Sequence, residues 1–404
     1  MRVFCVGDGR ALDTGFGAVM RYATDAFVRR GWAVAQLALF DEAPYCDSRP
    51  YWEAGVQPYF PVQRGVAGPG LLAGVLNDFD PDVLVVIRDP GSAAAFLLNE
   101  LAPTGSTVPV LLYAPLEGAP VLPEFGEAFR SATVAMTYTR WAAERLHAEH
   151  GVDVRAVPHG VDSSTFVPFA NPEERAATRQ LLGWDDKYVV MYVARNAKRK
   201  NHDRLVKAAA LLHGAGMADL MLYLHTTPFA GYSLGGWRLD WLAHWAGLPP
   251  QAIQFSRQLT PERGEPAVSL AAKYAAADLY VHPASVEGFG LPLLEAMACG
   301  LPVVIPDDAG NIVEVCGGAE LARVAVRDWE TWFTGAQLAN VHPSDLAGVI
   351  AQARQHPDWA AQQGHAGRQR ALCFPWEAMG EALADAVEQT AAAAGPLVVV
   401  EHVA

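Results

Sequence analysis

Charged residues are scarce in this chain of 404 residues, and lysine is especially rare, with five in all. Lysine and arginine together number 30 against 44 aspartates and glutamates, which gives a net charge of −14. A negative surface repels phosphate backbones and anionic lipid headgroups, so non-specific binding to nucleic acids or membranes is disfavoured. Hydrophobic residues reach 51%, and this content excludes wholesale disorder.

Cysteines and long apolar runs are also few. The five cysteines are scattered without a Cys-x-x-Cys pair, so neither a disulfide framework nor a zinc knuckle is expected. This pattern suits a reducing cytoplasm. The first apolar run is too short for a signal peptide, and no stretch reaches the ~18 apolar residues of a membrane-spanning helix. We expect a soluble cytoplasmic protein without stable membrane insertion.

Short apolar runs alternate with helix-length segments along the whole sequence. Val83–Ile87, for example, lacks the alternation of apolar and polar residues, which is typical of a strand buried on both faces. Alternating strands and helices predict right-handed βαβ units and parallel sheets. The predicted strands are 2–6, 33–39, 83–87, 108–113, 133–137, 154–157, 188–194, 220–225, 253–255, 279–282 and 303–305.

Two domains are predicted, because a single hydrophobic core stops growing near ~250–300 residues. A cluster of turn residues at 158–172 marks the boundary between residues 1–160 and residues 161–375. Residues 376–394 are predicted to form one long helix that stops at Gly395-Pro396. In such sheets ligands bind beyond the carboxyl ends of the strands, so a chemical motif should follow a strand. The role of the tail 397–404 stays open.

The first candidate site directly follows the strand 188–194. Residues 195–200 carry four of the few cations of the chain, Arg195, Lys198, Arg199 and Lys200. We expect Asn201 to cap the next helix, whose positive end would add to an anion site. A diphosphate is the predicted ligand, and a solvated basic turn is the alternative.

The second candidate site follows the strand 279–282 and runs from Glu287 to Glu295. Gly288 and Gly290 would let a ligand approach the main chain, and Pro292 suits the first turn of a helix. Amides at that helix start can donate to phosphate or sugar oxygens, while ionised carboxylates accept from hydroxyls. For Glu295 alone, the alternative is a surface acid that complements the helix dipole.

A third loop, Gly15-Phe16-Gly17, lies between the first strand and a helix predicted at 18–30, and it could meet a phosphate. As a dinucleotide fingerprint it lacks the third glycine. No metal site is predicted, because the Asp78-x-Asp80 pair precedes a strand and the twelve histidines lack ligand spacing. His159 and His282 are interpreted as satisfied structural histidines. Two aromatic-rich segments, 44–60 and 226–241, suit either sugar recognition or loop anchoring.

Taken together, these residues resemble the retaining GT-B glycosyltransferases of family 4, the glycosyl transferases group 1. The similar parts are the Glu287-x7-Glu295 motif, the Arg195 and Lys200 pair, the linker 158–162 and the loop 15–17. The resemblance implies two Rossmann-like, doubly wound α/β domains that face each other across a cleft, with the last helix crossing back onto the first domain. It also implies a sugar donor linked to UDP or GDP, with no other cofactor.

The resemblance assigns roles by position. Arg195 and Lys200 would bind the diphosphate, and Glu295 the ribose hydroxyls. Glu287 would hold the donor sugar, assisted by main-chain amides of Phe289, Gly290 and Leu291. The loop 256–260, which includes Leu259, would meet the base.

The acceptor side departs from the family, whose members often have a histidine after the strand that corresponds to 108–113. Glu117 or Asp89 is expected to take its place. A small-molecule or glycan acceptor is expected, and the net charge of −14 disfavours DNA. The alternatives are a sugar-nucleotide epimerase of the same fold, a non-catalytic nucleotide-sugar-binding protein and an NAD-linked oxidoreductase. The sequence leaves the donor, the acceptor and the oligomeric state open.

Overall fold

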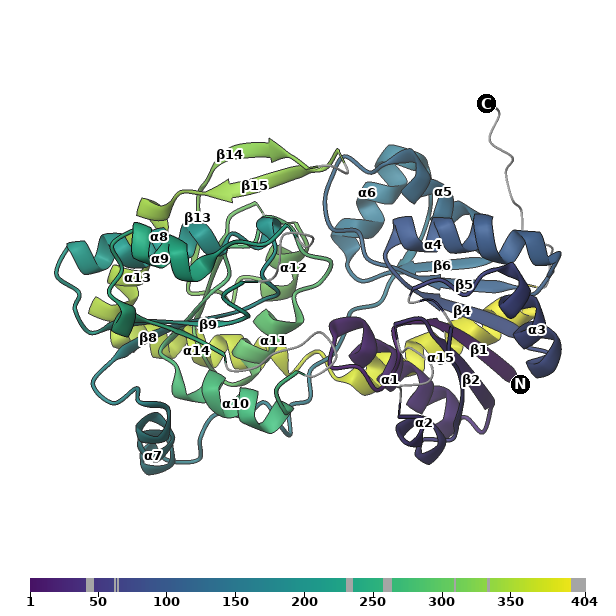
Figure 1. Cartoon of the computed structure of the whole chain (residues 1–404), viewed down its shortest axis with the longest axis horizontal. Coiled ribbons are helices and arrows are strands. Elements are labelled where there is room, and N and C mark those ends of the chain that lie inside the picture. The colour runs from purple at the N-terminus through teal and green to yellow at the C-terminus, as the bar shows by residue number, and fades with distance from the viewer. Residues whose placement is uncertain are drawn as a thin grey trace. The chain divides into compact units, whose positions relative to one another are not determined.

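The computed structural model describes residues 1–40, 47–61, 63, 65–229, 235–256, 264–308, 310–332 and 335–393. These residues form two compact units, each built around a parallel β-sheet (Figure 1). The described residues of unit 1 lie within 1–160 and 376–393, and those of unit 2 run from Val161 to Pro375.

Within the described residues, the sheet of unit 1 has seven strands in the order β3-β2-β1-β4-β5-β6-β7. All neighbouring strands are parallel. The strand order reverses between β1 and β4, so this position is the topological switch point of unit 1. The strands are β1 (Arg2–Gly7), β2 (Ala33–Ala38), β3 (Val56–Tyr59), β4 (Val83–Ile87), β5 (Val110–Tyr113), β6 (Val134–Thr137) and β7 (Arg155–Ala156).

Helices cover both faces of this sheet, which explains why its strands are continuous apolar runs. Side chains of α3, α4 and α5 join one face in a buried cluster, while α1 and α15 pack on other parts of the sheet. The helices are α1 (Gly15–Arg29), α2 (Arg49–Glu53), α3 (Pro69–Phe79), α4 (Pro90–Phe96), the π-helical η1 (Leu97–Leu101), the 3₁₀-helical η2 (Ala102–Thr104), α5 (Pro123–Ser131), α6 (Arg140–His150) and α15 (Trp376–Ala392).

The last helix, α15, packs in unit 1 beside α1 (Figure 1). The rings of Tyr22 and Trp376 stack with their centroids 4.5 Å apart. Gly380 permits close approach of the two helices, because a Cβ there would lie 2.8 Å from an atom of α1. Arg30 completes the contact with ion pairs to three acids of α15, Glu381, Asp385 and Glu388. The predicted return of the last helix to the first domain is confirmed.

Unit 2 repeats the topology of unit 1. Its sheet has the order β10-β9-β8-β11-β12-β13 among the described residues, and the order reverses between β8 and β11. The strands of unit 2 are β8 (Tyr188–Val193), β9 (Leu220–His225), β10 (Ile253–Phe255), β11 (Leu279–Val281), β12 (Val303–Pro306), β13 (Ala322–Val324), β14 (Val326–Thr331) and β15 (Gln337–Val341).

The helices of unit 2 connect these strands, and its 3₁₀ turn η3 contains Lys200. They are α7 (Pro172–Leu182), η3 (Lys198–Lys200), α8 (His202–Gly214), α9 (Leu239–Trp245), η5 (Pro250–Ala252), α10 (Ala267–Ala276), α11 (Leu291–Ala298), α12 (Asn311–Cys316), α13 (Pro343–Gln355) and α14 (Pro357–Ala371). No helix in the described part of the chain is both long and apolar enough to cross a membrane.

Four observed strands, β3, β13, β14 and β15, are absent from the sequence prediction. β3 lies in the aromatic segment interpreted as a loop, and it is an edge strand, where Pro58 is tolerated. The two large sheets are parallel, as predicted, and β14 and β15 add an antiparallel pair that the sequence did not predict. Most of β14 is exposed and polar, and a search for buried apolar runs does not detect such a strand.

Candidate active site at the switch point of unit 2

The loops after β8 and β11 leave the same edge of the unit 2 sheet, because these parallel strands are neighbours in register. Main-chain contacts join the two loops directly. The N–H of Ser285 donates to the carbonyl of Arg199 at 3.0 Å, and the Arg199 guanidinium donates to the carbonyl of Val286 at 3.2 Å. The first two motifs found in the sequence therefore meet at the switch point.

Asn201 strengthens this junction, although it does not cap α8 as predicted. Its backbone is left-handed, with φ of 53°, whereas a capping side chain requires an extended backbone. Its side-chain amide donates instead to the Pro283 carbonyl at 3.0 Å and to the Ser285 hydroxyl at 2.8 Å. The predicted cap is wrong, because this side chain links the loop after β8 to the loop after β11.

Lys200 and Glu287 form a buried ion pair between these loops. The Lys200 Nζ lies 2.5 Å from the Glu287 Oε1, and the two side chains are only 9% and 12% exposed. Burial alone would raise the pKa of Glu287, but attraction by Lys200 outweighs it and lowers the pKa to about 2. Arg199 adds a second cation, 3.8 Å from the Glu287 Oε2. Glu287 is therefore ionised at neutral pH and lies beside two positive charges.

His282 lies beside the same carboxylate. Its Nε2 is 3.5 Å from the Glu287 Oε1, and its side chain is 1% exposed. Burial lowers the pKa of His282 to about 4, so the ring is neutral at pH 7. Neither ring nitrogen forms a hydrogen bond with another described residue. The interpretation of His282 as a satisfied structural histidine is wrong. The feature of the sequence that could have indicated a site residue is its position directly after β11.

Glu295, the second acid of the motif, has a different environment. It lies on the second turn of α11, and its Oε2 accepts a hydrogen bond from the Tyr274 hydroxyl at 3.1 Å. No cation among the described residues forms an ion pair with it. Burial raises the pKa of Glu295 to about 8, against a small lowering by the Tyr274 hydrogen bond. The sequence gave no sign that Tyr274 is its partner.

The start of α11 provides main-chain donors beside the motif. Gly290 precedes the helix with φ of 92°, and a Cβ there would lie 2.6 Å from the Ile312 side chain. The N–H groups of Gly290 and Leu291 have no acceptor among the residues described. Pro292 has no N–H to leave unpaired. Phe289, Gly290 and Leu291 thus stand at a helix N-terminus, where an anion is favoured.

Arg195 lies on the loop after β8 but is exposed and does not contact Glu287. Its neighbour Asn196 is buried and forms two hydrogen bonds of 2.8 Å with the main chain of Trp237. These bonds fasten the loop to the segment after β9. Of the four predicted charged residues, the structure brings Lys200 and Glu287 into contact, whereas Arg195 and Glu295 form no ion pair with either of them in the described part of the chain.

The sequence also predicted ligand contacts for two other loops, 256–260 in unit 2 and 15–17 in unit 1. Leu259 lies outside the described residues. In unit 1, α1 begins at Gly15, three residues before its predicted start. The Thr14 hydroxyl accepts the N–H of Gly17 at 2.9 Å, so this helix start is capped internally. A Cβ on Gly17 would lie 2.3 Å from the Leu12 carbonyl oxygen, so packing alone requires glycine. The exposed Gly15 and the adjacent Phe16 remain candidates for phosphate contact.

The Asp78-x-Asp80 pair has structural roles at the amino end of β4. Asp78 accepts a hydrogen bond from the Tyr59 hydroxyl at 2.6 Å, and Asp80 ends α3 with φ of 47°. Across the described ranges, no three His, Cys, Asp or Glu side chains converge as potential metal ligands.

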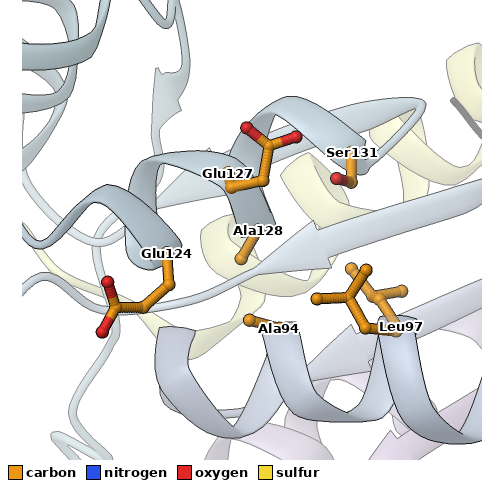
Figure 2. A pocket seen from close by; sticks show the side chains of 7 residues that line it. Ala94, Leu97, Glu124, Glu127, Ala128 and Ser131 are labelled. Carbon is orange, nitrogen blue, oxygen red and sulfur yellow. The ribbon is translucent and has the colours of Figure 1, made fainter. Parts of the chain in front are cut away.

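A pocket in unit 1 lies between α4, η1 and α5 (Figure 2). Ala94 and Leu97 line one side, and the carboxylate of Glu127 on α5 points away from them. Its volume of about 20 Å³ has room for little more than one water molecule. A sugar or a nucleotide does not fit there.

The repeated strand order and the site at the switch point define a GT-B fold. Residues 187–337 match the family described as glycosyl transferases group 1, so unit 2 carries a domain of this family. Among solved structures, sucrose-phosphate synthase from Thermosynechococcus elongatus aligns with a TM-score of 0.75 and 19% identity. The alignment covers 97% of this chain and 99% of that structure. The predicted fold and family resemblance are confirmed.

Curated relatives match part of the chain. A GDP-mannose-dependent alpha-(1-6)-phosphatidylinositol monomannoside mannosyltransferase from Mycolicibacterium smegmatis is 28% identical over 264 residues, 63% of this chain and 62% of that protein. A D-inositol 3-phosphate glycosyltransferase from Rhodococcus opacus is 31% identical over 230 residues, 54% of this chain and 47% of that protein. The chain thus spans 62% and 47% of the length of these two relatives.

Proposed function

We propose that this chain is a retaining glycosyltransferase that moves a sugar from a UDP- or GDP-linked donor to a hydroxyl group of a small-molecule or glycan acceptor. The buried pair of Lys200 and Glu287, beside the start of α11, carries this proposal. The group 1 domain supports it, as do relatives whose names describe glycosyl transfer.

The cations of unit 2 would act on the leaving diphosphate. In the reaction, the bond between the anomeric carbon and the phosphate oxygen breaks, and negative charge collects on the departing phosphate. Lys200 and Arg199 would stabilise that charge together with the N–H groups of Gly290 and Leu291 at the start of α11. Arg195, exposed on the same loop, would attract the diphosphate from solvent.

The two carboxylates would hold the hydroxyl groups of the donor. Glu287 is ionised and accepts hydrogen bonds only, which suits the hydroxyls of the donor sugar. Glu295 would take the ribose hydroxyls. The acceptor oxygen forms the new bond to the anomeric carbon, and its proton passes to the departing phosphate. Attack on the face that the phosphate leaves retains the configuration, as the family resemblance implies.

We also propose that transfer needs no metal ion. Two cations and a helix N-terminus can supply the positive charge that Mg²⁺ supplies in metal-dependent transferases. Turnover should therefore be the same with and without excess EDTA, and NMR should show an α-linked product from an α-linked donor. Loss of activity on chelation would contradict metal independence, and a β-linked product would contradict retention.

The central experiment is a thermal-shift screen of nucleotide sugars, followed by turnover with the best donor and a panel of acceptors. The proposed function predicts release of the nucleoside diphosphate together with a glycosylated acceptor. Conversion of the donor to another sugar nucleotide without any acceptor would instead indicate an epimerase. Tight donor binding without nucleotide release would indicate a binding protein, and stabilisation by NAD alone would indicate an oxidoreductase.

A further inference from the structure

The antiparallel strands β14 and β15 belong to unit 2 but contain none of the motifs found in the sequence (Figure 1). The inner strand, β15, is fixed in the core, because Leu338, Ala339 and Val341 are buried. The outer strand, β14, is mostly exposed. The pairing continues beyond β14, since the N–H of Trp332 donates to the carbonyl of Ala336 at 2.8 Å. The two strands therefore form an anchored support at the surface of unit 2.

The inner strand contacts the junction between the loops after β8 and β11. The Oδ1 of Asn340 accepts hydrogen bonds from the Ser285 hydroxyl at 3.2 Å and from the Asn201 side-chain amide at 3.4 Å. Asn340 is buried, so water competes little for these bonds. The support is therefore joined to the place where the two loops of the candidate site meet.

The outer strand carries two acids that face cations near this junction. The Glu330 Oε1 lies 2.8 Å from the Lys198 Nζ, and the Asp328 Oδ2 lies 3.8 Å from a guanidinium nitrogen of Arg204. Both acids are exposed, so each pair adds little stability. These contacts bring β14 beside the cationic loop.

Trp332, directly after β14, packs against Arg199 of that loop. The guanidinium carbon lies over the indole, 5.6 Å from the ring centre. Cation–π attraction acts within ~6 Å and strengthens where water is excluded. The Arg199 side chain is only 13% exposed, so water screens this contact little. An aromatic ring holds a cation without cancelling its charge, whereas a carboxylate neutralises it.

Arg199 is also held by the loop after β11. Its guanidinium donates to the Val286 carbonyl at 3.2 Å and lies 3.8 Å from the Glu287 Oε2. The cation is therefore held from two segments of unit 2, that loop and the end of β14. A group that stabilises charge in a transition state acts best when its position is fixed before the reaction.

We propose that Trp332 is a positioning residue for sugar transfer, and that it acts through Arg199 by holding the guanidinium in place for the departing phosphate. The strands β14 and β15 are the support for this contact. This inference rests on the proposed function, and it adds to the donor site a residue from outside the motifs of the sequence.

Steady-state kinetics of two substitutions at position 332 test the contact. Trp332→Leu keeps an apolar side chain without a π face, so we expect kcat to fall about 5–10-fold while the donor KM changes less than about 2-fold. Trp332→Phe keeps an aromatic face and should stay within about 3-fold of the wild-type kcat. Trp329→Leu is the matched control, because this tryptophan of β14 is 50% exposed, and its kcat should equal that of the wild type.

A double-mutant cycle tests whether Trp332 acts through Arg199. In the Arg199→Met background, Trp332→Leu should change kcat less than about 2-fold, because the cation that it positions is gone. Arg199→Lys tests the same contact from the other side, should Trp332→Leu lower the melting temperature. It keeps the charge but replaces the planar guanidinium by a compact ammonium group, so kcat should fall as in Trp332→Leu.

The outcomes separate this inference from the proposed function. Wild-type kcat in Trp332→Leu or in Arg199→Lys would overturn the inference, as would equal kcat values in Trp332→Leu and Trp332→Phe. Losses that multiply in Trp332→Leu/Arg199→Met would show that Trp332 acts by another route. All of these results leave the proposed function intact. A wild-type chain that releases no nucleoside diphosphate from any donor would contradict the proposed function, and this inference with it.

Discussion

The two sheets of this molecule share one strand order, yet the loops at their carboxyl edges carry different charged residues. In unit 1, the loops at and beside the switch point mix acids with cations: Asp8, Asp89 and Glu117 with Arg10, Arg88 and Arg140. In unit 2, the loop after β8 presents four cations, Arg195, Lys198, Arg199 and Lys200. Strand order decides where a ligand can bind, because parallel strands bring their following loops to one edge. The residues of those loops decide what binds there.

The helices that begin near these two edges also differ in whether a side chain caps their first N–H groups. In unit 1, Thr14 caps α1 and takes up the N–H of Gly17. In unit 2, α11 begins after Gly290 without a capping side chain, and its first amides are available. A helix start that is already capped has less to offer an anion. The comparison therefore supports the proposal that the main diphosphate site is in unit 2.

The largest expected effect tests the cationic edge. Lys200→Met removes the buried cation, so we expect kcat to fall by about 10²–10³, the range seen when one transition-state donor is removed. It also leaves Glu287 buried without its closest partner, and such a loss costs about 3–5 kcal/mol of stability. Both quantities are measurable, by steady-state kinetics at saturating donor and by urea unfolding.

A double variant separates these two effects. In Lys200→Met/Glu287→Gln no unpaired charge remains, so stability should recover most of the loss while activity stays low. Wild-type kcat in the single variant would show that the cationic edge is not the donor site. Recovery of activity in the double variant would show that the single variant failed only because it was unstable.

Most of the parallel fold was predictable from the sequence. Val83–Ile87 is a strand at its predicted bounds, because a strand buried on both faces must be apolar throughout. β14 was not predictable in this way, since its residues are largely exposed and polar. It pairs with β15, the next strand along the chain, and that pairing depends on hydrogen bonds between the two strands rather than on an apolar pattern within β14.

The location of the site in the fold was predictable from the sequence, but the contacts between its side chains were not. Lys200 and Glu287 follow strands of one parallel sheet, so their common edge could be inferred. Their direct ion pair could not, because it depends on how two loops fold against each other. For the same reason the sequence misled on Asn201, whose left-handed backbone turns its side chain to the neighbouring loop. His282 was not predicted as a site residue, because its burial and the lack of hydrogen-bond partners for its ring nitrogens arise from the tertiary structure.

Glu295 of unit 2 forms no ion pair with a cation among the described residues. The effect of its ionisation on stability should therefore depend on pH in the opposite sense to that of Glu287. The pKa of Glu295 is about 8 in the folded chain against an ordinary value of 4.5, so folding favours the protonated form. The resulting stability is fully present below pH 4.5 and is lost as the pH rises towards 8. Relative to Glu295→Gln, the wild type should therefore lose unfolding free energy between these values.

Urea unfolding of both proteins at pH 5, 7 and 9 measures this difference. Glu287→Gln provides the opposite case, because the pKa of Glu287 is lowered to about 2. Stability from that carboxylate is present above pH 4.5 and is lost as the pH falls towards 2. Parallel pH curves for the wild type and Glu295→Gln would show that Glu295 is not protonated in the folded chain.

The smallest expected effect concerns Arg195, the exposed cation on the loop after β8. Exposed charge pairs contribute about 1 kcal/mol or less, so Arg195→Ala should raise the Kd of a nucleoside diphosphate only about 3–5-fold. The effect should fade near 1 M salt, where screening acts over about 3 Å. Lys187→Ala is the control, because it removes the same charge directly before β8, at the opposite edge, and should not change Kd. A loss of affinity that persists at high salt would show that Arg195 contacts the ligand in a desolvated site, as Lys200 is proposed to do. Equal losses in both variants would show that net charge alone attracts the diphosphate, and the contrast between the two sheet edges would then not explain its binding.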